Sequence, residues 1–349
     1  MFLSNARKGL RCAALLFTAS LIGTASASAQ TAAEFYKGRQ LTLIVSSGPG
    51  GGYDTYSRML ARFIGKHFPG GEPRIVIQNM PGADGITALN YVYNVSARDG
   101  SVIADTYSTM PFYNLLDGRN AKFDPLKLHW LGSISKAISV CIAWETSNFK
   151  TIEDTMERSM RLSGTGVGGW RVTLPRLYNL IAGSKFEVIT GYATPNDYLA
   201  IERGEVDGSC TTYDTLRATK MNWIEGKKIR FLAQFGFGPT QGLEGVPMGL
   251  DKVKNPEDRR AMELILSQQE TGRPYVTPPD VPADRVQYLR EAFDATMKDP
   301  DFIDAARKAS LWFEPLTSAQ IDALIKKAYA SPPELVAHAK SLLERALPK

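Results

Sequence analysis

The sequence predicts an α/β protein of two domains, with the cleft between them as the expected place of a functional site. Its 349 residues exceed the ~250–300 at which one hydrophobic core usually divides into two. Strand and helix patterns alternate along the chain, and each half contains a Gly-rich loop between a strand and a helix. A hydrophobic share of 44% and a charged share of 22% are typical of a soluble globular protein and exclude collagen-like and disordered classes.

The first third of the chain has a repeated order of strand, loop and helix. The β-branched run 41–45 leads into the Gly-rich loop 46–52, and apolar residues then recur at intervals of three and four, with Asp54 as the expected N-cap. A second strand, loop and helix follow over 74–93, and a third strand over 101–106. This order indicates βαβ units and a largely parallel sheet.

A second set of elements begins near Ser139. We expect strands over 139–144, 161–163, 186–190, 206–212 and 229–234, and helices over 152–160, 172–182 and 198–203.

The last seventy or so residues differ, because they carry only helical spacing. The expected helices cover 286–298, 301–311, 318–330 and 333–347. Ser318 is suited to an N-cap, and Pro332-Pro333 to the entrance of the final helix.

Residues 1–29 have the pattern of a secretory signal peptide. Arg7, Lys8 and Arg11 precede a short apolar run, and small residues lead to a cleavage site near Ala29. The run of about ten apolar residues is too short for the ~20 that a membrane span needs. The signal-peptide pattern and the short apolar run lead us to expect a periplasmic protein without direct membrane insertion. The alternative for residues 1–29 is an N-terminal amphipathic helix.

Charge, cysteine and histidine usage narrow the functional classes. Removal of the signal peptide changes the formal net charge from +5 to +2, and the sequence has no basic block interleaved with aromatic residues, so nucleic acid is not an expected partner. The three histidines lack metal-ligand spacing, and we expect no metal site and no cofactor. Cys141 and Cys210 are expected to be small buried apolar residues, with a disulfide in an oxidising compartment as the alternative.

The two Gly-rich loops, 46–52 and 164–169, are the main candidates for binding. Each precedes a helix, where free backbone N–H groups and the helix dipole attract anions. Ser47 and Thr165 add hydroxyl donors. Neither a P-loop nor the G-x-G-x-x-G dinucleotide fingerprint is present, so we favour capture of a carboxylate by backbone amides over the alternative of two ligand-free turns.

Other side chains suggest supporting roles. Arg171 could pair with a ligand carboxylate through two hydrogen bonds, and Trp170 could stack on an aromatic ring; a surface arginine and a packing tryptophan are the alternatives. The sequence contains no Gly-x-Ser-x-Gly motif and no serine or cysteine adjacent to a histidine, so we do not expect an enzyme.

Together these residues resemble a known family. The segment Gly48-Pro49-Gly50-Gly51-Gly52-Tyr53-Asp54, followed by Arg58, is similar to the Pro-Gly-Gly-x-x-Asp-x-x-x-Arg signature of tripartite tricarboxylate transporter receptors, the Bug/TctC-like proteins. Later landmarks of that family are matched in order by Asn79-x-Pro81-Gly82-Ala83, Asp99-Gly100, loop 164–169, Gly191-Tyr192 and Gly204-Glu205-Val206-Asp207.

The resemblance implies a type II periplasmic binding-protein fold, with two α/β lobes joined by two crossing strands. It implies lobe 1 from residues 30–137 plus 272–349 and lobe 2 from 138–271, with crossings near 139–144 and 273–276. Among ligand-binding residues, the resemblance carries over to Ser46, Ser47, Gly51, Gly52, Asp54, Thr165, Gly166, Val167 and Gly168. Small polar residues are usual in the family where Trp170 and Arg171 stand, so these two depart from its pattern. We expect apolar contacts to the ligand from Tyr53, Trp170, Tyr192 and Tyr213, and we add Pro81, Gly82 and Arg171 to the predicted site.

The function implied is that of an exported receptor. It would capture a small carboxylate, either a di- or tricarboxylate or an aromatic acid, in the cleft between the lobes. As a monomer it would deliver this ligand to membrane transporter subunits similar to TctA and TctB. Two alternatives remain open at this point: a periplasmic sensory protein for a signalling partner, and an exported enzyme acting on a small organic acid.

Overall fold

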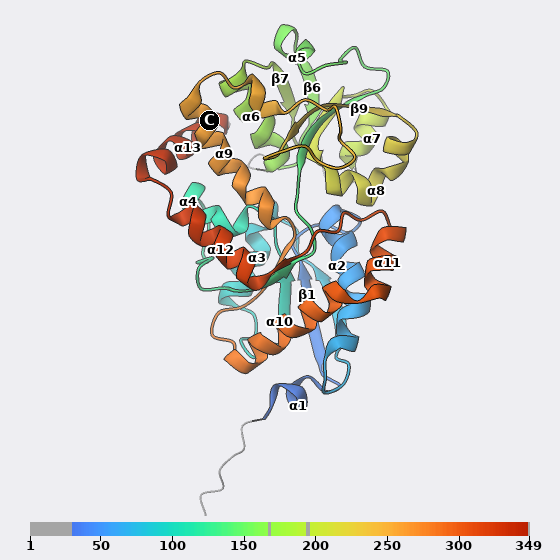
Figure 1. The fold of residues 1–349 in the computed structure, drawn as a ribbon, viewed down its shortest axis with the longest axis vertical. Helices are drawn as coiled ribbons and strands as arrows, with labels where there is room; N and C mark the ends of the chain where they lie inside the picture. The colour runs from blue at the N-terminus through green and yellow to red at the C-terminus, as the bar shows by residue number, and fades with distance from the viewer. Residues whose placement is uncertain (1–29, 167–168, 193–195, 348–349) are drawn as a thin grey trace, which may run out of the picture. The chain divides into compact units, whose positions relative to one another are not determined.

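The computed structural model describes residues 30–166, 169–192 and 196–347. The expected signal peptide therefore lies outside the described residues. Two separate β-sheets with helices packed against them make up the fold (Figure 1).

The first sheet has six strands and is partly parallel. β1 pairs in parallel with β2 and β3, whereas β10 is antiparallel to β3 and β4, and β11 is antiparallel to β4. The expectation of a largely parallel sheet holds for β2, β1 and β3 alone. The other strands adjoin the crossings and the C-terminal helices, and they pair in antiparallel fashion. The strand order is β11 (Leu316–Thr317), β4 (His129–Ser133), β10 (Pro274–Thr277), β3 (Val102–Asp105), β1 (Gln40–Val45) and β2 (Arg74–Asn79).

The second sheet has five strands and the same mixture. β6 pairs in parallel with β7 and β8, and β5 is antiparallel to β8 and β9. The order is β7 (Phe186–Ile189), β6 (Met160–Ser163), β8 (Gly208–Thr212), β5 (Ser139–Trp144) and β9 (Ile229–Phe235).

Helices cover both faces of each sheet, so four hydrophobic clusters form the core. One face of the first sheet packs against α2 (Gly52–Phe63), α10 (Ala283–Lys298) and α11 (Pro300–Lys308), and the other against α3 (Ile86–Asn94) and α12 (Ser318–Tyr329). One face of the second sheet packs against α6 (Trp170–Ala182), α9 (Pro256–Leu266) and α13 (Pro333–Ala346), and the other against α7 (Asn196–Glu202) and α8 (Tyr213–Glu225). The remaining short helices are α1 (Ala32–Tyr36), α4 (Tyr113–Leu116) and α5 (Asp154–Glu157).

The two sheets are connected by short segments that lie side by side. Residues 134–138 lead from β4 to β5, and residues 272–273 lead to β10. The Ala137 amide donates to the Gln269 carbonyl at 3.0 Å, and the Arg273 amide donates to the Ser135 carbonyl at 3.1 Å. The crossings therefore precede the strands 139–144 and 273–276 at which we expected them.

Gly272 is required at the second crossing. Its φ is +53°, and an added Cβ would lie 1.6 Å from the Ser135 carbonyl oxygen. A side chain at this position would therefore collide with the neighbouring crossing, and only glycine allows the two backbones to approach so closely.

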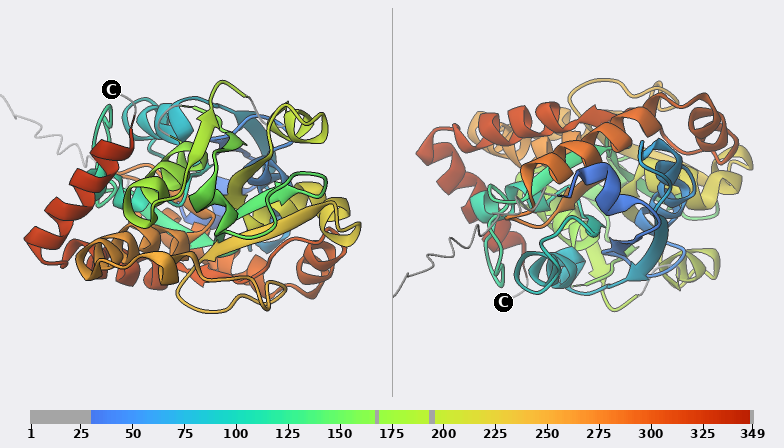
Figure 2. Two further views of the ribbon diagram at one scale, coloured as in Figure 1. Left: turned by 90° about the horizontal axis from the view of Figure 1, so that it is seen from above. Right: turned by 90° about the horizontal axis from the view of Figure 1, so that it is seen from below.

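The final helix returns to the second sheet. α12 packs against β4, whereas α13 packs against α9 and α6. In the left view of Figure 2 the red α13 lies beside the light-orange α9. Ala339, Leu342 and Ala346 accordingly belong to the core cluster of the second sheet.

Three local expectations are wrong. The helix expected over 152–160 is only the single turn α5, and the helix α8 was not expected, because its residues are polar and weakly amphipathic. The N-cap of α12 is Thr317 and not Ser318, since the Thr317 hydroxyl and the Gln320 side chain form a capping box. Pro332 and Pro333 do begin the final helix as expected.

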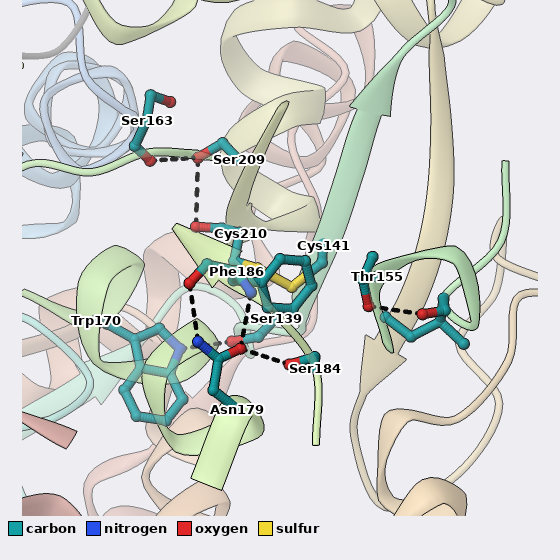
Figure 3. The surroundings of a disulfide bond; sticks show 11 residues. Ser139, Cys141, Thr155, Ser163, Trp170, Asn179, Ser184, Phe186, Ser209 and Cys210 are labelled. Carbon is teal, nitrogen blue, oxygen red and sulfur yellow. Dashed lines mark hydrogen bonds between the residues drawn. A yellow bond between two sulfur atoms is a disulfide. The ribbon is translucent and has the colours of Figure 1, made fainter. Parts of the chain in front are cut away.

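Cys141 and Cys210 form a disulfide, which corrects the expectation of two separate apolar residues. They lie directly opposite each other on the antiparallel strands β5 and β8, and both point into the same core cluster (Figure 3). The sequence could not show this, because the two strands become neighbours only in the folded sheet.

No helix among the described residues is long and apolar enough to cross a bilayer.

Replacing both cysteines, Cys141→Ala and Cys210→Ala, should lower the free energy of unfolding by about 2–4 kcal/mol, because the bond closes a loop between residues 69 positions apart. Urea denaturation with and without dithiothreitol measures this. The reductant should destabilise the wild type and leave the double variant unchanged. A wild-type midpoint that does not respond to reductant would contradict the bridge.

Candidate functional site

The two Gly-rich loops border one cavity of about 390 Å³. The first loop follows β1 and contributes Ser46, Ser47, Gly48, Gly51 and Gly52, and the second follows β6 and contributes Thr165 and Gly166. Both loops lie at the carboxyl ends of parallel strands, where α/β sheets commonly bind ligands. The other lining residues are Tyr53, Pro81, Gly82, Ala83, Asp84, Tyr107, Ser108, Thr109, Ala137, Trp170, Arg171, Tyr192, Thr211, Thr212, Asp214 and Thr215.

The first loop presents the N-terminus of α2 to this cavity. α2 begins after Gly51, which has no side chain to cap the helix, so amide groups of the first turn remain available to a ligand. A side chain at Gly52 would displace its neighbours, because an added Cβ would lie 2.8 Å from both an Arg273 guanidinium nitrogen and the Thr215 hydroxyl.

Asp54 holds this loop from behind and is not its N-cap. Its carboxylate lies in the first turn of α2 and accepts hydrogen bonds from the Gly50 amide at 2.8 Å, Arg58 Nε at 2.8 Å and Asn79 Nδ2 at 2.9 Å. Burial opposes its charge, but these bonds outweigh the burial and hold the pKa of Asp54 below its usual value. At 2% exposure it does not line the cavity, and we assign it a positioning role.

Asp105 organises the start of the same loop. It is 1% exposed, and its carboxylate accepts from the Ser46 amide and Ser46 Oγ, each at 2.7 Å, and from Ser57 Oγ at 2.5 Å. The Ser46 hydroxyl is therefore already used as a donor and can only accept from a ligand. Burial raises the pKa of Asp105 to about 6, although the serine hydrogen bonds and Arg273 lower it.

A buried ion pair lies behind the cavity between α2 and α8. The Arg273 guanidinium pairs with Asp214, donates to Thr215 Oγ1 at 2.9 Å and lies over the Tyr53 ring at 4.5 Å and the Tyr56 ring at 4.2 Å. Burial opposes the charge of Arg273, but Asp214 outweighs it and holds the pKa of Arg273 above its usual value.

Arg171 and Trp170 line the cavity but have partners within the protein. Arg171 pairs with the buried carboxylate of Asp197, and its second terminal nitrogen donates to the Tyr198 hydroxyl at 2.9 Å. The Trp170 indole donates to Ser139 Oγ at 2.7 Å, as Figure 3 shows. Arg171 is therefore not a surface arginine, and its charge is compensated by Asp197; its pairing with a ligand carboxylate stays a prediction.

Asp84 reaches the cavity from the short 3₁₀ helix Ala83–Gly85. Burial raises the pKa of Asp84 to about 6, and Arg171 lowers it. Its carboxylate lies against the start of α6, because a Cβ added to Gly169 would be 2.8 Å from both carboxylate oxygens.

The structure brings most of the predicted site residues together. Of the expected set, all the described residues except Asp54 and Tyr213 line the cavity. Tyr213 is instead buried between Phe231 and Trp312. Val167 and Gly168 lie outside the described residues.

Sequence reasoning missed several lining residues. Tyr107 and Ser108 follow β3, and a rule based on the carboxyl ends of strands could have found them. Asp214 and Thr215 begin the unexpected helix α8, and no sequence signal indicated them. The described residues contain no group of three or more His, Cys, Asp or Glu side chains placed to hold a metal ion.

The variant Asp105→Asn should flatten the pH dependence of stability. In the wild type the folded pKa of about 6 lies above the unfolded value of about 3.9, so the folded state binds the proton more tightly. As the pH rises from about 4 to 6, the ionisation of Asp105 therefore lowers the free energy of unfolding by roughly 3 kcal/mol. The difference in unfolding free energy, wild type minus variant, should fall by ~2–3 kcal/mol between pH 4 and 7 in urea titrations. A constant difference would contradict this assignment.

No protein-family model and no curated protein matches the sequence. Solved structures do match. A TctC solute binding protein from Polaromonas is 17% identical, with 89% of this chain and 99% of that chain covered at a TM-score of 0.60. The periplasmic binding protein BugD is 18% identical, covering 89% of this chain and 98% of that chain at 0.69. Rpa4515 of R. palustris, solved with adipate, is 17% identical, covering 88% and 97% at 0.67. The predicted fold is thereby confirmed: the chain has the two-lobed α/β fold of the TctC and Bug periplasmic solute-binding proteins.

Proposed function

We propose that this protein is an exported solute receptor that captures a small carboxylate with an apolar body. One observation carries the proposal. The loops at the carboxyl ends of strands from both sheets border a single cavity of about 390 Å³, large enough for a small organic acid.

The chemistry of the cavity wall supports an anionic ligand. Free amides at the start of α2 and the hydroxyls of Ser47 and Thr165 can donate to a carboxylate. Three or four such bonds contribute a gross ~5–12 kcal/mol, of which ordering costs remove a part. Micromolar affinity therefore also needs apolar contact, which Tyr53, Tyr107 and Trp170 can provide.

The two lobes we propose are residues 30–137 with 272–349, and residues 138–271. The proposal rests on the crossings at 134–138 and 272–273. By its place in the sequence α13 belongs to the first lobe, but it packs against α6 and α9 of the second lobe. Ligand binding would favour a closed arrangement, because only that arrangement brings both loops to one ligand.

We also propose that residues 1–29 direct export to the periplasm. The partner would then be the membrane subunits of a tripartite tricarboxylate transporter, to which the receptor delivers its ligand. The sequence motifs and the shared fold of the TctC protein support this assignment.

Isothermal titration with adipate, citrate, benzoate and acetate tests the function, and Gly52→Ala tests the site. We expect heat from at least one acid, and Gly52→Ala should weaken its binding by about tenfold, or about 1.4 kcal/mol, because the methyl group would displace the first turn of α2.

Gly238→Ala is the control for the same substitution outside the cavity. Gly238 is exposed, and an added Cβ there has no neighbour within 4 Å, so this variant should bind nearly as the wild type does. Thermal unfolding shows whether either variant fails to fold, and Ser47→Ala, expected to weaken binding without backbone movement, then replaces Gly52→Ala. Absence of heat with every acid would end the proposal.

A further inference from the structure

A second cavity of about 350 Å³ adjoins the first. The two cavities share six wall residues, so together they form one bipartite space. These shared residues are Ala83, Asp84, Tyr107, Thr109, Gly166 and Trp170.

Each compartment has both polar and apolar walls. Serine, threonine and glycine residues border the first compartment together with the rings of Tyr53, Tyr107 and Trp170. In the second, apolar side chains from α4, α13 and their neighbours lie beside the polar residues Asp117, Arg119, Asn120 and Gln268. These apolar residues are Ile86, Met110, Phe112, Leu116, Leu343 and Leu347. A ligand that fills both compartments can therefore place a polar head at the start of α2 and an apolar body beside α4 and α13.

The acid at the junction has no partner. Among the described residues, the Asp84 carboxylate receives no hydrogen bond and forms no ion pair. Each arginine on the cavity walls is committed elsewhere: Arg171 to Asp197, and Arg119 to Asp117. Asp214 is in turn neutralised by Arg273 behind the wall. Asp84 is thus the acid on these walls that has no ion-pair partner among the described residues.

Asp84 also takes the place of a ligand anion at the second loop. Its carboxylate oxygens lie against Gly169, the residue that precedes α6, and therefore occupy the end of the helix that attracts negative charge. A ligand carboxylate at this point would be repelled by Asp84. The N-terminus of α2, across the same compartment, remains for it.

We propose that the ligand is a zwitterionic acid with an apolar or aromatic body: its carboxylate lies at the start of α2, its ammonium group faces Asp84, and its apolar body enters the second compartment. This inference rests on the proposed function, because it assumes that the bipartite cavity binds a small organic acid.

Titration calorimetry at pH 7.5 with L-phenylalanine and 3-phenylpropionate, which lacks only the ammonium group, tests the inference. Phenylalanine should bind at least about tenfold more tightly, because a desolvated ion pair with Asp84 adds to its affinity. Asp84→Asn should reduce this ratio to near one. Asp251→Asn, which makes the same change at a mostly exposed acid outside both compartments, should preserve the ratio.

The possible outcomes separate the two proposals. Equal or tighter binding of 3-phenylpropionate, or binding of adipate alone, overturns the zwitterion and leaves a carboxylate receptor. A ratio that survives Asp84→Asn overturns the role of Asp84. Absence of heat from adipate and from both phenyl acids contradicts the receptor itself.

Leu343→Trp tests the apolar compartment separately. The larger side chain should fill part of the space beside α13 and weaken binding of phenylalanine by about tenfold, because the aromatic body then has no room. Ser341→Trp places the same side chain on the exposed face of the same helix and should leave the affinity unchanged. Equal affinities for both variants would place the apolar body elsewhere.

Discussion

The ion pair between Arg273 and Asp214 is the interaction on which the cavity depends most. Arg273 stands at the second crossing between the sheets, is 1% exposed, and contacts the first turns of both α2 and α8. The loss of one partner from such a pair leaves a buried charge without compensation, at a cost of ~3–5 kcal/mol. The position of the α2 N-terminus relative to α8 therefore depends on a pair of which Asp214 borders the cavity and Arg273 lies behind it.

Charges around the cavity are arranged in compensated pairs. Arg273 with Asp214 and Arg171 with Asp197 each join residues that are distant in sequence, and each cancels a positive charge that an anionic ligand would otherwise meet. Attraction for an anion is thus left to main-chain amides and hydroxyls, which are directional and carry no net charge. In the proposed receptor, the ligand would accordingly be selected by its shape and by its match to these donors.

Hydrophobic periodicity predicted most elements because both sheets are buried on two faces. The strands 41–45 and 139–144 were expected nearly at their observed ends, as was the helix Ala283–Lys298. Local chemistry was harder to predict. Asp54 has the composition of an N-cap, yet Gly51 takes that position and Asp54 accepts from the Gly50 amide one turn back. Sequence patterns do not distinguish these two uses of an aspartate near a helix start.

The residues of the site were predicted in part, and the contacts that the prediction missed share a physical cause. Residues of the Gly-rich loops were found because backbone donors at helix starts leave a mark in the sequence. The pair of Arg171 with Asp197 was not predicted, because the two residues are 26 positions apart in sequence. The disulfide and the contribution of Asp214 likewise depend on strands and helices that become neighbours only after folding.

Gly272 has a consequence for how the lobes and the cavity communicate. Its carbonyl accepts a hydrogen bond from the Tyr53 hydroxyl at 3.4 Å, and the Tyr53 hydroxyl oxygen accepts one from the Ser108 amide at 3.1 Å. A change in the backbone angles at Gly272 would therefore also move an aromatic ring on the cavity wall. In the proposed receptor, this single hydrogen bond would couple a rotation of one lobe against the other to the shape of the cavity.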